Sequence, residues 1–159
     1  MPITYARPSN GHYYNNVDGQ GSVIALETLR AYLKTRYEVL VDPPFDQFIH
    51  RPCPKLARLM AWHGVKTAAT ITAWNPESRL TDPATNAAAQ AELVSAIDAA
   101  GYHHLAVFGH DPDGIWPGEE SRLVLGISRS ALIDFGRRFS QNAVTMATRN
   151  GKPELLLLR

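Results

Sequence analysis

Residues 67–74 read TAATITAW, and this stretch decides the fold. Its side chains are small, apolar or β-branched at both odd and even positions, which is typical of a strand buried on both faces. Asn75 and Pro76 follow directly and end the strand, because proline has no backbone N–H to donate to a sheet. We therefore expect a central strand over 67–74, and the remaining elements are placed relative to it.

Two helices are expected downstream of this strand. Asp82 is suited to cap the first, with Pro83 in its first turn, or Thr85 to cap a slightly later start, and Gly101 is suited to end it. Ser128 is suited to cap the second helix. The strands expected in this part of the chain are 103–108, 122–127, 143–147 and 154–158.

The element order from residue 67 is β-α-β-β-α-β, with one strand added by the two-residue hairpin signal Asn150-Gly151. This order predicts an α+β fold with a ferredoxin-like split βαβ sheet. Right-handed crossovers then place strands 67–74 and 122–127 at the centre. An α+β sheet with a different strand order stays open at this point.

The N-terminal part predicts a helix and a short strand pair ahead of that sheet. The helix begins near Ser22 and carries a leucine stripe, and the strand pair lies within 37–50. Residues 1–21 lack periodicity and are expected to form a flexible or loosely docked arm, anchored through Tyr13 and Tyr14. Residues 22–159 are expected to form a single α+β domain.

Composition excludes several classes of protein. Among 159 residues, Lys and Arg number 16 and Asp and Glu 15, a net charge of +1, which argues against nucleic-acid binding through a broad basic face. No apolar run reaches the roughly 20 residues that span a bilayer, and no signal peptide is recognised. The single cysteine, Cys53, makes no internal disulfide. We expect a cytoplasmic protein without membrane contacts.

The predicted topology gathers four polar segments at one end of the sheet. They are TAWNPES, TN, EES and SQN, at residues 72–78, 85–86, 119–121 and 140–142. Each has a structural alternative: Asn75 fits the first position of a type I turn, while Ser78 and Asn86 fit helix caps. The candidate ligand-binding residues are Thr72, Asn75, Ser78, Asn86, Trp116, Ser121, Gln141 and Asn142.

Glu119 and Glu120 stand before a strand that is expected to be central. One of them is expected to be partly buried among amides and hydroxyls, where a carboxylate needs hydrogen bonds or a cation, or its pKa rises. A raised pKa suits general acid–base chemistry, so Glu119 is the candidate catalytic residue. The alternative is that both are solvated charges at the end of a loop.

Metal and cofactor sites are not predicted. His110, Asp111 and Asp113 lie in GHDPDG, which is foremost a turn sequence. The chain has no GxGxxG, GxxxxGK[ST], GxSxG or HExxH motif, so no dinucleotide, P-loop or standard hydrolase site is indicated.

The segments TAWNPES, TN, GIWPGEES and FSQNA, in this order, resemble a family of bacterial proteins known as domain of unknown function 3293. The resemblance extends over roughly residues 35–158. Ser140 stands where the family more often has glycine, and Glu119 is more typical of it than Glu120. The matching positions are Thr72, Asn75, Pro76, Ser78, Asn86, Trp116, Glu119, Ser121, Phe139, Gln141, Asn142 and Ala143.

Three functions are compatible with these observations. The first is binding of a small polar or nucleotide-like ligand at the polar end of the sheet. The second is an enzyme that uses Glu119 as general acid or base in the same pocket, assisted by Ser121 or Thr72. The third is a non-catalytic interaction protein, a homodimer for example, that pairs through the C-terminal edge strand ELLLL.

Overall fold

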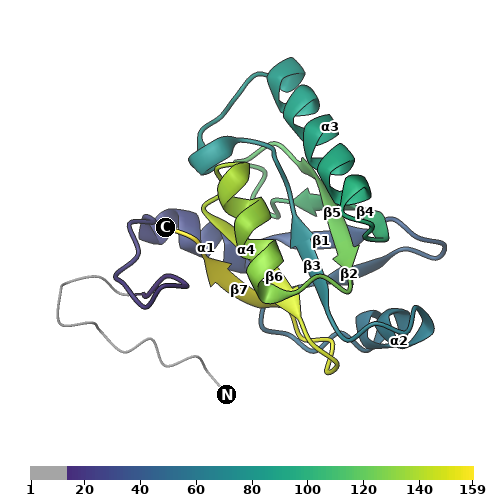
Figure 1. The fold of residues 1–159 in the computed structure, drawn as a ribbon. Helices are drawn as coiled ribbons and strands as arrows, with labels where there is room; N and C mark the ends of the chain where they lie inside the picture. The colour runs from purple at the N-terminus through teal and green to yellow at the C-terminus, as the bar shows by residue number, and fades with distance from the viewer. Residues whose placement is uncertain (1–13) are drawn as a thin grey trace.

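A computed structural model describes residues 14–159. In this range the chain combines helices with one seven-stranded sheet (Figure 1), as the expected α+β class requires. The helices are α1 (Leu26–Lys34), α2 (Pro54–Trp62), α3 (Pro83–Ala99) and α4 (Arg129–Arg138), with a short 3-10 turn η1 (Pro76–Ser78). The strands are β1 (Arg36–Val39), β2 (Phe45–Gln47), β3 (Ala68–Ile71), β4 (His104–His110), β5 (Glu119–Leu125), β6 (Ala143–Ala147) and β7 (Glu154–Leu157).

The strand order across the sheet is β2-β1-β4-β5-β3-β6-β7, and each neighbouring pair is antiparallel. The predicted central positions of β3 and β5 are confirmed, and so is the strand pair β1–β2. β3 ends at Ile71, earlier than expected, because the Thr72 hydroxyl accepts a hydrogen bond from the backbone N–H of Trp74 at 3.0 Å. That local bond turns the chain out of the sheet.

The two faces of the sheet are covered differently. Helices α3 and α4 pack Leu93 and Leu132 against strand residues such as Val124, and these side chains form one apolar core. On the other face α2 supplies a second apolar core, in which Leu56 packs with Leu123. Because strand side chains alternate between faces, that second face also carries polar residues further along the same strands. Its polar part is left for the site described below.

Local capping signals were accurate predictors of the long helices. Asp82 accepts a hydrogen bond from the N–H of Thr85 at 2.9 Å and caps α3, with Pro83 in the first turn. Ser128 accepts from the N–H of Ala131 at 3.2 Å and caps α4. These contacts join residues three apart, so they depend little on the rest of the fold.

The expected start of the first helix is wrong. α1 begins at Leu26, because Ser22 has other partners: its hydroxyl donates to the carbonyl of Arg159 at 2.5 Å, and its oxygen accepts from the N–H of Ile24 at 3.2 Å. Ser22 therefore ties the N-terminal part of the chain to the C-terminus, and the helix begins four residues later.

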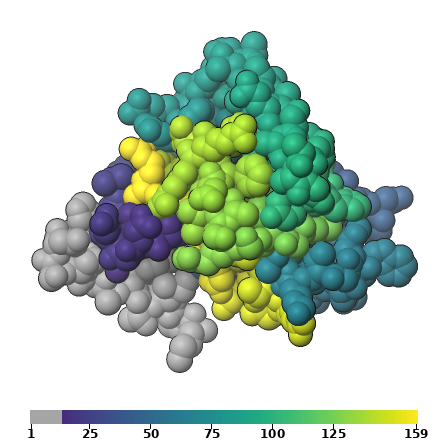
Figure 2. Space-filling model, in the orientation of Figure 1, coloured from purple at the N-terminus to yellow at the C-terminus, as the bar shows by residue number. Residues whose placement is uncertain are grey.

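The expected arm over 1–21 lies partly outside the described residues, as does Tyr13. Its described part, 14–21, is docked: the N–H of Val17 donates to the carbonyl of Leu157 at 2.8 Å, and Asp18 pairs with Arg137 at 2.7 Å. Figure 2 shows this segment, in purple, against the C-terminal residues in yellow. β7 is an edge strand as expected, but the Val17 contact occupies part of its free edge. The structure therefore weakens the case for pairing through that edge.

The C-terminal strand added by a hairpin is confirmed, since β7 pairs antiparallel with β6, but the two-residue turn expected at Asn150-Gly151 is wrong. Residues 148–153 connect β6 to β7. Within this longer loop the N–H of Gly151 donates to the carbonyl of Thr148 at 2.9 Å, and Asn150 accepts from the N–H of Lys152 at 3.1 Å. Gly151 has φ 72° and packs against α2, so the loop is held by a tertiary contact that a dipeptide signal does not contain.

Among the described residues, no helix is both long and apolar enough to cross a membrane.

Candidate functional site

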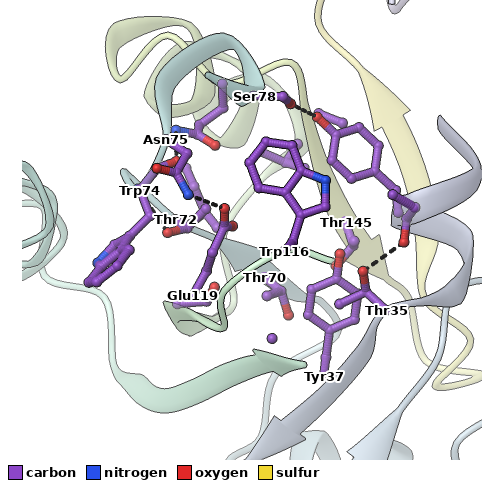
Figure 3. A pocket seen from close by; sticks show the side chains of 18 of the residues that line it. Thr35, Tyr37, Thr70, Thr72, Trp74, Asn75, Ser78, Trp116, Glu119 and Thr145 are labelled. Carbon is purple, nitrogen blue, oxygen red and sulfur yellow. Dashed lines mark hydrogen bonds between the residues drawn. The ribbon is translucent and has the colours of Figure 1, made fainter. Parts of the chain in front are cut away.

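A cavity of about 100 Å³ opens on the polar part of the sheet face that α2 leaves uncovered. One water molecule needs roughly 10–15 Å³ of such space, so the cavity has room for a small molecule. Figure 3 shows the side chains around it. They come from α1, from six strands and from the loops that follow β3, β4 and α4. The lining includes Thr28, Tyr32, Thr35, Tyr37, Thr70, Thr72, Trp74, Asn75, Ser78, Gly109, Asp111, Trp116, Glu119, Ser121, Gln141, Thr145 and Leu155.

The carboxylate of Glu119 is the main charged group inside the cavity wall. Its Oε1 accepts a hydrogen bond from Nδ2 of Asn75 at 2.8 Å (Figure 3). Glu119 lies in β5 rather than in the preceding loop, and its strand position fixes the direction of the side chain. Glu120, the next residue, is exposed. The expectation that one of the two acids is partly buried is therefore confirmed, and Glu119 is that residue, bonded to the Asn75 amide.

Asn75 is held rigidly. It is the first residue of a turn, as the sequence favoured, because its carbonyl accepts from the N–H of Ser78 at 2.9 Å. The turn is not type I, since Glu77 has φ 55°. The backbone of Asn75 is left-handed, with φ 47°, and its side chain is 3% exposed. Oδ1 of Asn75 accepts from the N–H of Thr81 and from Nδ2 of Asn86, both at 3.0 Å, while Oδ1 of Asn86 accepts from the N–H of Asn75 at 2.9 Å. Two amides thus fix each other and direct one N–H donor at Glu119.

Ser78 and Asn142 form a second polar group at the cavity. Ser78 is not a helix cap: its hydroxyl pairs with the hydroxyl of Tyr32 at 2.5 Å and accepts from Nδ2 of Asn142 at 2.9 Å. Oδ1 of Asn142 in turn accepts from Arg159 at 3.2 Å. This network joins α1 to the C-terminal strands and positions the Tyr32 hydroxyl on the wall.

The floor of the cavity is a set of hydroxyl-bearing strand residues. Nε2 of Gln47, in edge strand β2, donates to the Thr70 hydroxyl at 3.0 Å in β3. Three strands, β1, β4 and β5, lie between β2 and β3 in the sheet order. The two side chains can meet only because the sheet curves across these three strands. Thr145 and Ser121 lie beside Thr70 and are buried. The curvature of the sheet therefore creates the hollow.

Gly109 contributes by having no side chain. It stands between Tyr37 and Glu119 in the sheet, paired with both. A Cβ at this position would meet Thr35 at 3.6 Å and Tyr37 at 3.7 Å, which are ordinary contacts. A larger residue could therefore be accommodated at position 109 without a clash, and its side chain would fill the space beside Glu119.

Burial governs the proton equilibria of the site. It raises the pKa of the Glu119 carboxyl above its ordinary value, and the hydrogen bond from Asn75 only partly opposes it. Burial also raises the pKa of the Tyr37 hydroxyl, with the Glu119 charge as the second cause, and burial raises the pKa of Tyr32. Both tyrosines are therefore neutral hydroxyls at physiological pH.

Replacing Glu119 by Gln is expected to make stability less dependent on pH. In the unfolded chain the carboxyl titrates near 4.5, and its folded pKa is higher. Its contribution to stability is therefore fully present below 4.5 and is lost as the pH rises through the folded pKa. E119Q keeps an acceptor for Asn75 and has no titrating carboxyl at this position. The free energy of unfolding of E119Q relative to that of the wild type should therefore increase with pH.

Urea unfolding between about pH 4 and pH 8 measures this difference. E120Q is the matched control, because its side chain is the neighbouring exposed acid. An E119Q advantage that stays constant or shrinks with rising pH would contradict the assignment.

The Trp116 side chain lies over the cavity on the loop between β4 and β5 (Figure 3). Asp111 organises this loop: its carboxylate accepts from the N–H groups of Asp113, Ile115 and Trp116 at 2.8 to 2.9 Å. The N–H of Trp116 is the main cause, with that of Asp113 second, of a lowered pKa at Asp111. Asp111 is therefore a positioning residue for Trp116.

Substitution of Asp111 by Ala is expected to loosen this loop without unfolding the domain. Three backbone donors lose their acceptor, so amide hydrogen exchange at residues 113, 115 and 116 should accelerate by about tenfold or more. Asp113→Ala is the control, since Asp113 makes only a 3.5 Å ion pair with Lys34 through its side chain. Equal exchange in both variants would show that Asp111 does not hold the loop.

The structure brings most of the predicted site residues together. Thr72, Asn75, Ser78, Trp116, Glu119, Ser121 and Gln141 line the cavity. Asn86 and Asn142 stand behind it and hold Asn75 and Ser78. The Gln141 amide donates to the carbonyls of Trp74 and Phe139 at 3.2 and 3.3 Å, so its nitrogen serves the loop rather than a ligand. The side-chain N–H groups of Gln141 therefore hold the protein backbone in place.

The sequence reasoning missed the wall opposite Glu119. Tyr32 from α1, Thr35 directly after α1 and Tyr37 from β1 lie there. A signal was present: Thr28, Tyr32 and Thr35 recur at helical spacing on a face other than the leucine stripe. Thr70 and Thr72 likewise alternate within the central strand and mark one of its faces as polar.

Within residues 14–159, no group of three or more His, Cys, Asp or Glu side chains is arranged to hold a metal ion. His110 instead pairs with Glu38 at 3.0 Å, the Asp111 carboxylate accepts from N–H groups of the loop, and Asp113 pairs with Lys34 at 3.5 Å.

Comparison with known families places the polar rim of the cavity in a recognised sequence segment. Residues 71–144 match the family described as Protein of unknown function (DUF3293). This match supports membership of the chain in the DUF3293 family. The matched segment is shorter than the expected 35–158, yet it contains the Glu119, Asn75 and Asn86 cluster. Tyr32 and Tyr37 lie outside the matched segment. Searches of curated proteins and of solved structures found no match.

Proposed function

We propose that the cavity binds a small polar molecule. The observation that carries the proposal is a partly buried carboxylate, Glu119, that lines a cavity of about 100 Å³ and is oriented by the fixed Asn75 amide. Binding sites commonly combine a preformed hollow with a few convergent polar groups and a carboxyl of perturbed pKa. Ser78, Ser121 and Thr145 supply further hydroxyls, and Trp116 supplies a flat apolar surface.

The test is a ligand-observed NMR fragment screen on the wild type and on a graded series at Gly109. Gly109→Ala and Gly109→Val add one and then three carbons beside Glu119, so fragments should bind progressively more weakly. Glu120→Val, an exposed change on the neighbouring strand, is the control. Fragments that bind all four proteins equally would place binding elsewhere and overturn the proposal.

A second candidate is an enzyme with Glu119 as general acid or base. The raised pKa favours it, because a carboxyl that titrates nearer neutrality exchanges protons more readily at physiological pH. Incubating fragment hits with the protein and following them by NMR distinguishes the two functions. Conversion of a hit by the wild type and not by E119Q supports catalysis, whereas unchanged hits support binding alone.

The four strands β3, β4, β5 and β6 and the helices α3 and α4 resemble a known α+β unit in their arrangement. We propose that β3, α3, β4, β5, α4 and β6 form a ferredoxin-like split βαβ unit, with β1, β2 and β7 added at its edges. The order β4-β5-β3-β6 with antiparallel neighbours supports it. The charge balance and the lone cysteine support a place in a reducing cytoplasm.

A further inference from the structure

The cavity wall carries acidic side chains and no basic ones among the described lining residues. Its ionisable side chains are the carboxylates Glu119 and Asp111 and the hydroxyls Tyr32 and Tyr37, and no Lys, Arg or His is among the lining residues that the structure describes. A phosphate or carboxylate group placed here would meet a partly buried like charge with no cation to compensate it. The lining therefore disfavours anionic ligands, including nucleotides.

Basic residues near the cavity have partners elsewhere. Arg159 and Arg79 pair with Glu77 at 3.5 and 3.4 Å, and Lys34 pairs with Asp113 at 3.5 Å. Glu119 makes no ion pair with any basic side chain in the described range, and its one hydrogen-bond donor there is Asn75. A partly buried carboxylate with a single neutral partner favours a cation from solution as its second partner.

Aromatic side chains line the same cavity as this carboxylate, among them Trp116, Tyr32 and Tyr37. In Figure 3 the Trp116 ring stands between the Asn75–Glu119 pair and the side of the cavity formed by Thr35 and Tyr37. The negative face of an aromatic ring attracts ammonium groups, most strongly in tryptophan and more so when the cation is desolvated. Anionic oxygen and aromatic carbon thus offer complementary contacts to one kind of ligand.

We infer that the ligand is a small organic cation, an amine in its ammonium form, held between Glu119 and Trp116. This inference rests on the proposed binding function and names its ligand class. The cavity of about 100 Å³ limits the ligand to a few heavy atoms beyond the ammonium group. The hydroxyls of Ser121 and Thr145 on the floor accept N–H donors of a primary amine.

The test compares four probes: n-butylammonium, 1-butanol and butyrate, which share a chain and differ in charge, and tetramethylammonium, which has no N–H donor. The indole N–H resonances of Trp116 and Trp62 report binding in ¹H–¹⁵N NMR spectra at constant ionic strength. Trp62 is 87% exposed on α2 and lies outside the cavity wall, so it is an internal reference.

The expected result is a saturable shift of Trp116 with n-butylammonium, at an affinity about tenfold or more above that of butanol and butyrate. E119Q should lose a similar factor while staying folded. Trp116→Phe should retain more of the affinity than Trp116→Leu, because Phe keeps a ring. Weaker binding of tetramethylammonium would support the N–H contacts to the hydroxyls.

Two failures are distinguishable. If butanol or butyrate shifts Trp116 with an affinity equal to that of n-butylammonium, the cation inference is overturned and the binding function stands. If no probe shifts Trp116 and the fragment screen also finds no Gly109-sensitive ligand, both are overturned. Equal n-butylammonium affinity in E119Q and the wild type would likewise overturn the inference.

Discussion

Replacing Asn75 by Ala is expected to lower the free energy of unfolding by about 3 kcal/mol or more. The buried Asn75 side chain satisfies three groups: the N–H of Thr81, the amide of Asn86 and the carboxylate of Glu119. Each buried polar group left without its partner costs roughly 1–3 kcal/mol. Alanine also tolerates the left-handed backbone at φ 47° less well than asparagine does.

Urea unfolding at fixed pH measures this loss, and two further variants separate its causes. Asn75→Gly removes the same hydrogen bonds without the Cβ strain, so it should be about 1 kcal/mol more stable than Asn75→Ala. Asn75→Asp keeps the acceptor toward Thr81 and places a second oxygen against Glu119. Its stability should therefore fall as the pH rises and both acids ionise. An Asn75→Ala loss below about 1 kcal/mol would contradict the network.

Gly151→Ala is expected to cost about 2–4 kcal/mol, the second largest effect. A Cβ on Gly151 would lie 2.6 Å from the carbonyl oxygen of Cys53 and 3.0 Å from Ala57 at the start of α2. The backbone at Cys53 has no rotamer that relieves this clash, so the loop or the helix must move. The positive φ of 72° adds conformational strain.

Gly114→Ala isolates the strain from the clash. Gly114 has φ 66° and nothing within 4 Å of a built Cβ, so alanine there should cost only about 1 kcal/mol. Unfolding midpoints of the two variants in urea provide the comparison. Equal losses would mean that the contact between the 148–153 loop and α2 is not tight in solution.

The helix caps show what local sequence determines in this protein. Asp82 and Ser128 bond to N–H groups three residues ahead, and their helices were predicted with small errors at the ends. Ser22 carries the same capping chemistry, yet its hydroxyl bonds to Arg159, 137 residues away. A capping residue predicts a helix only where no distant partner competes for the same oxygen.

The candidate site likewise has a part that local sequence and chain direction predict and a part that only the assembled sheet determines. Chain direction in the sheet was enough to place Asn75, Glu119 and Gln141 at one end, because strand order follows from the sequence of elements. The hollow itself was not predictable. It depends on the curvature that brings Gln47 to Thr70 and on the missing side chain of Gly109, and both are properties of the assembled sheet.

Glu119 and Tyr37 face each other across Gly109, but only the acid lies within the segment that matches the family, residues 71–144. The wall that carries Tyr32, Thr35 and Tyr37 comes from the part of the chain that precedes this segment. A protein that kept the matched segment and changed residues 28–37 would keep its anchoring acid while reshaping the space in front of it. Glu119 would recognise the charged group of a ligand, whereas residues 28–37 would determine the size of ligand that fits. Each of these two parts of the pocket could therefore change without the other.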